Sequence, residues 1–205
     1  AVMEGLKGAR DLSLLYDLRD EPSIGSFLLA TDSCFCEHCM GKMRGWLKER
    51  YGDLAMLNRE WGTGFENWEQ VEPMPTSSAL ARRREGNWNF APWNDHREFM
   101  NDSFLGICRQ QAELIRQHDP DAVVGLAGNQ CPWVFGGYDF SKLVPEMDWA
   151  EPYAYGNSLD CYRSFKRRRA VPLIKTSGLG GSVKARESML WTAVFQAGGH
   201  SGTII

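Results

Sequence analysis

The sequence predicts an α/β protein whose parallel sheet is part of a TIM (β/α)8 barrel. From residue 122 onward, short apolar segments alternate with helical segments, which is typical of a parallel sheet with crossover helices. Such a sheet is either open and doubly wound or closed into a barrel. The chain stops on Gly202-Thr-Ile-Ile205 within an expected strand and starts on what looks like the tail of a helix. Because a barrel of about 250 residues needs three further βα units, we expect a barrel fragment.

The first half of the chain predicts one strand and then mainly helices. Apolar residues at 12–18 predict a buried strand, and Gly52 ends a helix expected at 36–51. Apolar side chains recur at helical spacing in that helix, at Met40, Met43, Trp46 and Leu47. A short helix at 54–61 follows, and the proline-containing stretch 62–92 is expected to be a long irregular region.

A strong helix is expected at 94–118, because it carries a long apolar stripe and Asp119-Pro120 closes it. The stripe consists of Phe99, Phe104, Ile107, Cys108, Ala112 and Ile115. The rest of the chain alternates regularly. Strands are expected at 122–126, 148–151, 171–176 and 202–205, and helices at 140–146, 158–168 and 183–197.

Composition and charge exclude several classes of protein. The chain has 205 residues and a net charge of −3, so it offers no broad positive field for nucleic acid. It contains neither an apolar stretch of about 18 residues nor the pattern of a signal peptide, so we expect no membrane partner and, by default, a cytoplasmic location. The glycine-rich phosphate-binding motifs are absent. The oligomeric state stays open, a homo-oligomer included.

Three of the six cysteines cluster in Cys34-Phe-Cys-Glu-His-Cys39. Thiolates at this C-x-C-x-x-C spacing can converge on one tetrahedral zinc ion, which still requires a fourth ligand. The alternatives are free thiols in a local turn and a reactive thiol centre in an unrelated α/β enzyme. The scattered cysteines, Cys108, Cys131 and Cys161, are expected to be buried apolar residues.

Three motifs in the first third of the chain resemble those of glycoside hydrolase family 42, the bacterial β-galactosidases. They are the cysteine segment above, Trp46-Leu-Lys-Glu-Arg-Tyr-Gly52, and Leu57-Asn-Arg-Glu-Trp-Gly-Thr63 with Phe65 just after. The resemblance is sharp over residues 20–65 and looser to residue 205. It implies that residues 1–205 are part of a single (β/α)8 catalytic domain, from just before the fourth barrel strand to within the eighth.

The resemblance also implies roles for several residues. Glu21 matches the general acid/base at the end of the fourth strand. The usual Asn-Glu pair reads Asp20-Glu21 here, so the amide that binds the sugar 2-hydroxyl is replaced by an acid. The three cysteines match the ligands of a structural zinc ion whose fourth cysteine lies upstream of this chain.

A retaining glycosidase needs a second carboxylate about 5 to 5.5 Å from the first, and the family has it at the end of the seventh strand. The corresponding segment here, 171–178, contains no acid. Glu151, at the end of the preceding strand, is the best substitute, and it is as well interpreted as an acid that binds sugar. The same comparison makes Asn129 a hydroxyl ligand, and aromatic residues are candidates for stacking on sugar. These are Trp133, Tyr153 and Tyr155.

These observations predict a glycoside hydrolase that acts on a carbohydrate, a galactoside by resemblance, with Glu21 as general acid/base. The alternative is a barrel that binds saccharide but has lost the nucleophile of the seventh strand. The presence of a carboxylate opposite Glu21 discriminates between the two.

Overall fold

The computed structural model describes residues 15–25, 32, 34–129, 139–152, 158–165 and 184. Within them a parallel sheet has the order β1-β2-β3, formed by β1 (Leu15–Asp17), β2 (Val123–Asn129) and β3 (Trp149–Pro152). The central strand β2 pairs in parallel with both neighbours, with Leu15 opposite Val123 and Gly125 opposite Trp149. The predicted parallel α/β architecture is therefore confirmed in this part of the chain.

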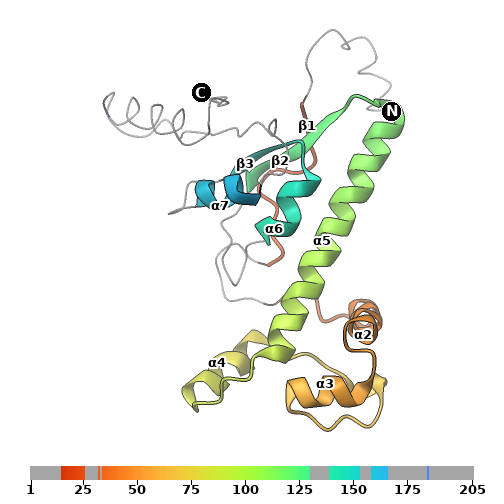
Figure 1. The fold of residues 1–205 in the computed structure, drawn as a ribbon, viewed down its shortest axis with the longest axis vertical. Coiled ribbons are helices and arrows are strands. Elements are labelled where there is room, and N and C mark those ends of the chain that lie inside the picture. The colour runs from red at the N-terminus through yellow and green to blue at the C-terminus, as the bar shows by residue number, and fades with distance from the viewer. Residues whose placement is uncertain are drawn as a thin grey trace.

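Helices lie against this sheet (Figure 1). They are α5 (Ala91–His118), α6 (Phe140–Leu143) and α7 (Ser158–Phe165), with the 3-10 turn η3 (Val144–Glu146) after α6. Their apolar side chains meet those of β2 and β3 in a buried cluster. It includes Leu105, Cys108, Leu126, Phe140, Leu143, Ala150 and Tyr162, and we call it the sheet core. A smaller apolar cluster joins Ala112 of α5 to Ala122 and Val124. None of the described helices is long and apolar enough to cross a membrane.

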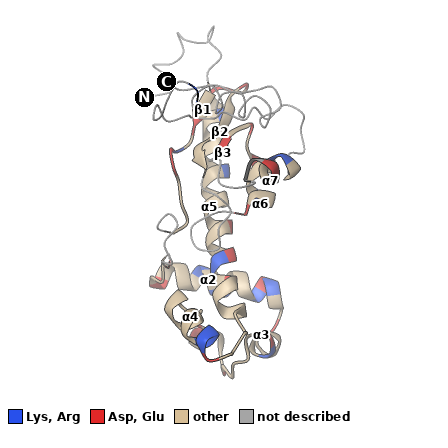
Figure 2. Ribbon diagram, turned by 90° about the vertical axis from the view of Figure 1, so that its left-hand side faces the viewer, with Lys and Arg blue, Asp and Glu red and all other residues tan. Residues whose placement is uncertain are grey.

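A second group of helices forms a lobe at the other end of α5 (Figures 1 and 2). This helical lobe contains α2 (Glu37–Tyr51), α3 (Leu54–Trp61), the 3-10 turn η2 (Trp68–Gln70) and α4 (Thr76–Arg84). Its apolar residues form a separate cluster with the first half of α5. We call it the lobe core, and its buried members are Met40, Met43, Leu47, Leu57, Trp61, Val71 and Phe99.

The length of α5 explains where the lobe lies relative to the sheet. A helix of 28 residues is about 42 Å long, whereas the seven residues of β2 span about 23 Å. The end of α5 leads directly into the start of β2, so the helix runs antiparallel to the strand and extends well past its other end. The lobe therefore lies beyond the carboxyl ends of the strands, the side on which barrel enzymes build their active sites.

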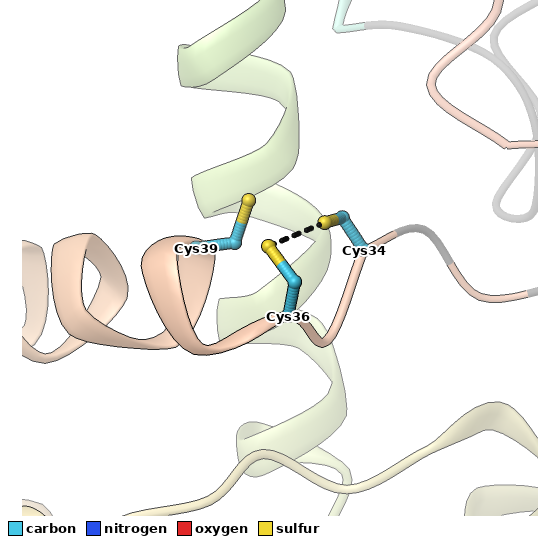
Figure 3. A group of neighbouring side chains, drawn as sticks. All are labelled: Cys34, Cys36 and Cys39. Carbon is cyan, nitrogen blue, oxygen red and sulfur yellow. Dashed lines mark hydrogen bonds between the residues drawn. The ribbon is translucent and has the colours of Figure 1, made fainter.

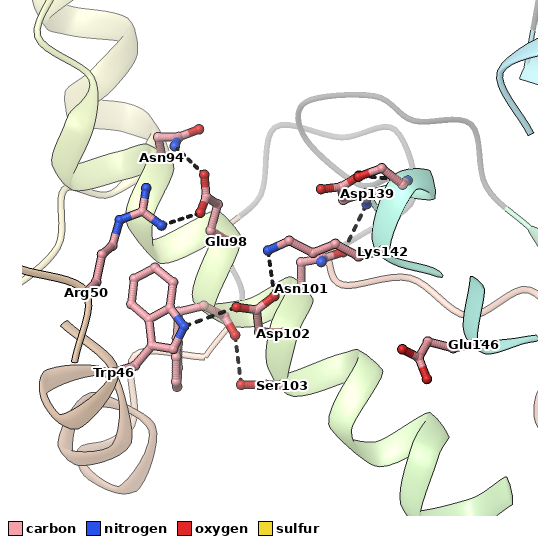
Figure 4. Close-up of polar contacts among 12 residues, drawn as sticks. Trp46, Arg50, Asn94, Glu98, Asn101, Asp102, Ser103, Asp139, Lys142 and Glu146 are labelled. Atoms are coloured by element: carbon pink, nitrogen blue, oxygen red, sulfur yellow. Dashed lines mark hydrogen bonds and ion pairs between the residues drawn. The ribbon is translucent and has the colours of Figure 1, made fainter. Parts of the chain in front are cut away.

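Polar contacts from one face of α5 join the lobe to the sheet side (Figure 4). Asp102 accepts hydrogen bonds from Trp46 Nε1 of α2 at 3.1 Å and from Lys142 Nζ of α6 at 2.8 Å. One turn earlier, Glu98 accepts a bond from Arg50 at 2.6 Å. The helix thus positions both groups of elements at once.

Residues 62–92 are not the single irregular region that the sequence predicts. They contain η2 and the helix α4. In α4, Ala79, Leu80 and three arginines are strong helix formers, and Pro75 directly precedes the first helical residue. The prolines and tryptophans around this short helix obscured its propensity. The strand and helix segments expected at 171–176, 183–197 and 202–205 lie outside the described residues.

Candidate functional site

The segment after β1 carries the predicted acid/base residue on a tight turn. Asp20 and Glu21 are both exposed, and Glu21 has a φ of 47°, in the left-handed region that favours glycine. The strand end before this turn is fixed by Asp17, whose Oδ1 accepts bonds from Ala127 N at 3.0 Å and Arg19 N at 3.2 Å. The turn thus presents the Glu21 side chain at the carboxyl end of the sheet.

The ends of β2 and β3 bring Asn129 and Glu151 together. Both side chains are buried, at 0% and 3% exposure. The pairing of the two strands is irregular between Leu126 and Asn129, where Gly128 has a φ of 58°. Glu151 Oε2 accepts a bond from Gly128 N at 3.0 Å, and Asn129 Nδ2 donates to Leu126 O at 2.8 Å. The carboxylate of Glu151 therefore holds the irregular end of β2 in place.

The oxygen of the Asn129 side chain is buried, and within the described part of the chain no group donates a hydrogen bond to it. A buried acceptor left unpaired costs free energy, typically about 1–3 kcal/mol. Such a group is poised to accept a bond from an incoming hydroxyl. This geometry is compatible with Asn129 as a ligand of a sugar hydroxyl.

The sheet order sets how far apart the acidic candidates lie. Glu21 follows β1 and Glu151 stands in β3, with one strand between them. Neighbouring strands are about 4.8 Å apart, so the two backbones are separated by about 10 Å. The carboxyl groups of Glu21 and Glu151 lie closer than this only if their side chains point toward each other. Three other predicted site residues lie outside the described part of the chain, namely Trp133, Tyr153 and Tyr155.

The three cysteines converge as the spacing predicts (Figure 3). Their sulfur atoms all lie within 4.8 Å of one another, and Cys34 Sγ donates to Cys36 Sγ at 3.2 Å. Cys36 is the N-cap residue that directly precedes α2, and Cys39 lies in the first turn of the helix. Three soft sulfur ligands on one ordered turn fit a thiophilic metal such as zinc.

The surroundings of the thiols change their acidities in opposite directions. The backbone of Cys39, followed by the Cys34 thiol, lowers the pKa of Cys36. A hydrogen bond with Cys34, together with burial, raises the pKa of Cys39 to about 12. One thiolate in the group therefore suppresses ionisation of another unless a cation binds between them.

Two residues beside this cluster were not singled out from the sequence. His96 of α5 is completely buried, and its ring stacks on Phe35 with 4.4 Å between centroids. Burial lowers the pKa of His96, an effect that the nearby backbone of Cys34 opposes. Asp32, just before the cysteines, accepts a bond from Thr76 N at 2.9 Å. Neither residue could be predicted from the sequence, because each of these contacts joins two segments that are far apart in the chain.

Comparison with known families agrees with this arrangement. A family model described as beta-galactosidase, glycoside hydrolase family 42, matches residues 26–184. The beta-galactosidase LacZ of Heyndrickxia coagulans is 27% identical over 82% of this chain, and the beta-galactosidase BgaA of a Thermus species is 36% identical over 61% of it. The chain spans only 27% and 19% of the lengths of these two relatives.

Solved structures with a similar fold include two enzymes. A beta-galactosidase from Bacillus circulans sp. alkalophilus has a TM-score of 0.67 at 20% identity, and a GH42 exo-carrageenase from Bacteroides ovatus has a TM-score of 0.74 at 16% identity. Each comparison covers 98% of this chain and about a third of the known structure, at 32% and 33%. The chain thus has the fold of part of a TIM barrel.

Proposed function

Since the chain belongs to glycoside hydrolase family 42, the beta-galactosidase family, we propose that the full-length protein hydrolyses a β-galactosidic bond with Glu21 as general acid/base. The observation that carries this proposal is the position of Glu21, exposed on a tight turn at the carboxyl end of β1. Catalytic groups of barrel enzymes stand at that end of their strands.

In the proposed reaction, the protonated Glu21 carboxyl gives its proton to the oxygen of the leaving sugar as the glycosidic bond breaks. The resulting carboxylate then takes a proton from the attacking water. An exposed turn suits both steps, because the leaving group and water reach the mouth of the barrel from solvent. Asp20 beside it, Asn129 and the aromatic residues are proposed to contact the sugar. The last are Trp133, Tyr153 and Tyr155.

We propose Glu151 as the first candidate for the second carboxylate. Its carboxylate accepts the bond from Gly128 N at the end of β3, and the carboxyl ends of barrel strands are where such enzymes place their catalytic groups. The backbones of β1 and β3 lie about 10 Å apart, so both side chains would have to point toward each other to bring the carboxyl groups to the 5 to 5.5 Å of a retaining pair. A role in binding sugar hydroxyls therefore remains an equal alternative for Glu151.

The decisive experiment compares Glu21→Gln with wild type in the full-length protein, on lactose and on an aryl β-galactoside with an activated leaving group. Loss of the acid should lower kcat/KM, which reports the step that breaks the glycosidic bond, by about 10²–10⁴-fold on lactose and by less on the activated substrate, which needs little protonation. Glu49→Gln, an exposed carboxylate of α2, is the matched control and should retain full activity.

Two results would contradict the proposal. Equal losses of kcat/KM on both substrates would indicate that Glu21 does not protonate the leaving group. A wild-type protein that binds galactosides but cleaves none of them would favour the saccharide-binding barrel instead.

We also propose that Cys34, Cys36 and Cys39 hold a structural zinc ion together with a fourth ligand outside this chain. The support is the convergence of the three sulfur atoms within 4.8 Å. Zinc there would brace the start of α2 and would take no part in bond cleavage. Elemental analysis of the full-length protein should give about one zinc per chain, a value that Cys36→Ser lowers and Cys161→Ser leaves unchanged. If the protein contains no zinc and takes up none on titration, the three cysteines do not form a zinc site.

A further inference from the structure

An aromatic contact joins the cysteine segment to α5. Phe35 lies between two of the three proposed ligands, Cys34 and Cys36. Its ring packs on the ring of His96, with 4.4 Å between centroids and an angle of 30° between planes. Any rotation of the backbone at Phe35 would move the sulfur atoms on both sides of it. The contact with His96 therefore bears directly on ligand geometry.

His96 itself is held firmly. It has no exposed surface, and among the described residues neither ring nitrogen has a hydrogen-bond partner of good geometry. Burial lowers the pKa of His96, and the backbone of Cys34 lies near enough to oppose this effect. Packing is therefore the main constraint on the ring. The preceding residue, Asp95, fixes this part of α5 to the lobe, because it accepts bonds from Tyr51 at 2.6 Å and from Trp61 at 2.7 Å. His96 thus offers Phe35 a rigid surface.

The segment is also fixed at both of its ends. Upstream, Asp32 accepts bonds from the backbone and the hydroxyl group of Thr76. Downstream, α2 starts with the bond from Met40 N to Cys36 O at 2.9 Å and packs its buried methionines into the lobe core. The middle of the segment, at Phe35, is the part whose position depends on His96.

We propose that His96 is a positioning residue for the metal site, one that holds Phe35 so that the three thiols converge before the metal binds. This inference rests on the proposed zinc site. A loop ordered in advance loses less conformational entropy when it binds a ligand, and so it binds more tightly. Residues that orient metal ligands typically contribute about 10–100-fold to affinity. The effect belongs to the aromatic ring of His96 and not to its proton.

The test measures zinc affinity of the full-length protein by competition with a chromophoric chelator. His96→Ala should weaken binding by about 10-fold or more, whereas His96→Phe, which keeps a flat ring, should stay within about threefold of wild type. His118→Ala, at the exposed end of the same helix, should change nothing. Melting curves of the metal-free proteins show whether each variant is folded.

Phe35→Ala provides a second route, because Phe35 is 40% exposed and its removal threatens the fold less than that of a buried residue. It should weaken zinc binding as much as His96→Ala does. If His96→Ala does not fold, Phe35→Ala alone tests whether the contact between the two rings positions the thiols. Unchanged affinity in either folded alanine variant overturns the positioning role and leaves the zinc site standing. Equal weakening in His96→Phe and His96→Ala also overturns it. If the wild-type protein binds no zinc, both the proposed zinc site and the role of His96 in it are wrong.

Discussion

The backbone at Glu21 is unusual for a glutamate. With a φ of 47°, it adopts a left-handed conformation that costs a non-glycine residue of the order of 1 kcal/mol or more. Asp17 stabilises the strand end before it through two backbone N–H groups. A strained residue at the mouth of a barrel is typical of a side chain that must project in a fixed direction, so this strain supports the proposed role of Glu21.

This strain predicts an unusual response to glycine. Glu21→Gly should abolish hydrolysis and yet keep or raise the free energy of unfolding, by up to about 1 kcal/mol, because glycine adopts this φ without a steric cost. Urea unfolding of the full-length protein, together with an activity assay, measures both effects.

The neighbouring residue supplies the control for that substitution. Among the described residues other than glycine, only Glu21 has a positive φ, so Asp20→Gly relieves no such strain. It should lower the free energy of unfolding slightly, because glycine has more freedom in the unfolded chain. If Glu21→Gly destabilises the protein as much as Asp20→Gly does, the glutamate is not strained.

At the scale of helices and strands, the sequence predicts the elements whose apolar spacing is clear. Helix α3 matches its predicted bounds at 54–61, α2 differs from its predicted bounds by one residue at its start, and β3 is shifted by one residue at both ends. Helix α4 was missed because its signal is local propensity and not an apolar stripe. The cysteine cluster was predictable because its three ligands are neighbours in sequence.

Contacts between elements were not predictable from spacing, and Asp95 shows why. In the sequence it is one acid in a long helix. In the structure it is 2% exposed and accepts bonds from Tyr51 of α2 and Trp61 of α3. No pattern within one segment indicates which donors a second and a third segment will bring to it. The same reason applies to His96 and Asp32.

Asp95 is therefore predicted to hold three helices of the lobe together. Asp95→Ala leaves the Tyr51 hydroxyl and the buried Trp61 indole N–H without their acceptor, and it should cost about 3 kcal/mol of unfolding free energy. Glu98→Ala, one turn along α5, removes a partly exposed ion pair with Arg50 and should cost less than about 1 kcal/mol. Urea unfolding followed by tryptophan fluorescence compares the two variants. Similar losses would show that Asp95 does not organise the lobe.

At the scale of the whole molecule, one helix serves two cores. Phe99 of α5 belongs to the lobe core, whereas Leu105 and Cys108 belong to the sheet core. Asp102, between them, binds α2 on one side and α6 on the other. The parallel sheet could be predicted from the alternation of strands and helices. This shared use of α5 could not, because the spacing of apolar residues along one helix does not indicate which other elements each of its faces will meet.

The shared helix predicts that damage to the lobe core opens the sheet core. Leu47 has no exposed surface, so Leu47→Ala should cost at least about 2 kcal/mol. Cys108 reports on the other core, because burial raises the pKa of its thiol to about 11 and only an opened core lets it react. If α5 couples the cores, Leu47→Ala should speed alkylation of Cys108 at pH 8 by about thirtyfold, as followed by mass spectrometry of its peptide.

Met56→Ala, an exposed change in α3, should leave that rate unaltered. An unchanged rate in a destabilised Leu47→Ala protein would mean that the lobe opens on its own while α5 stays packed on the sheet.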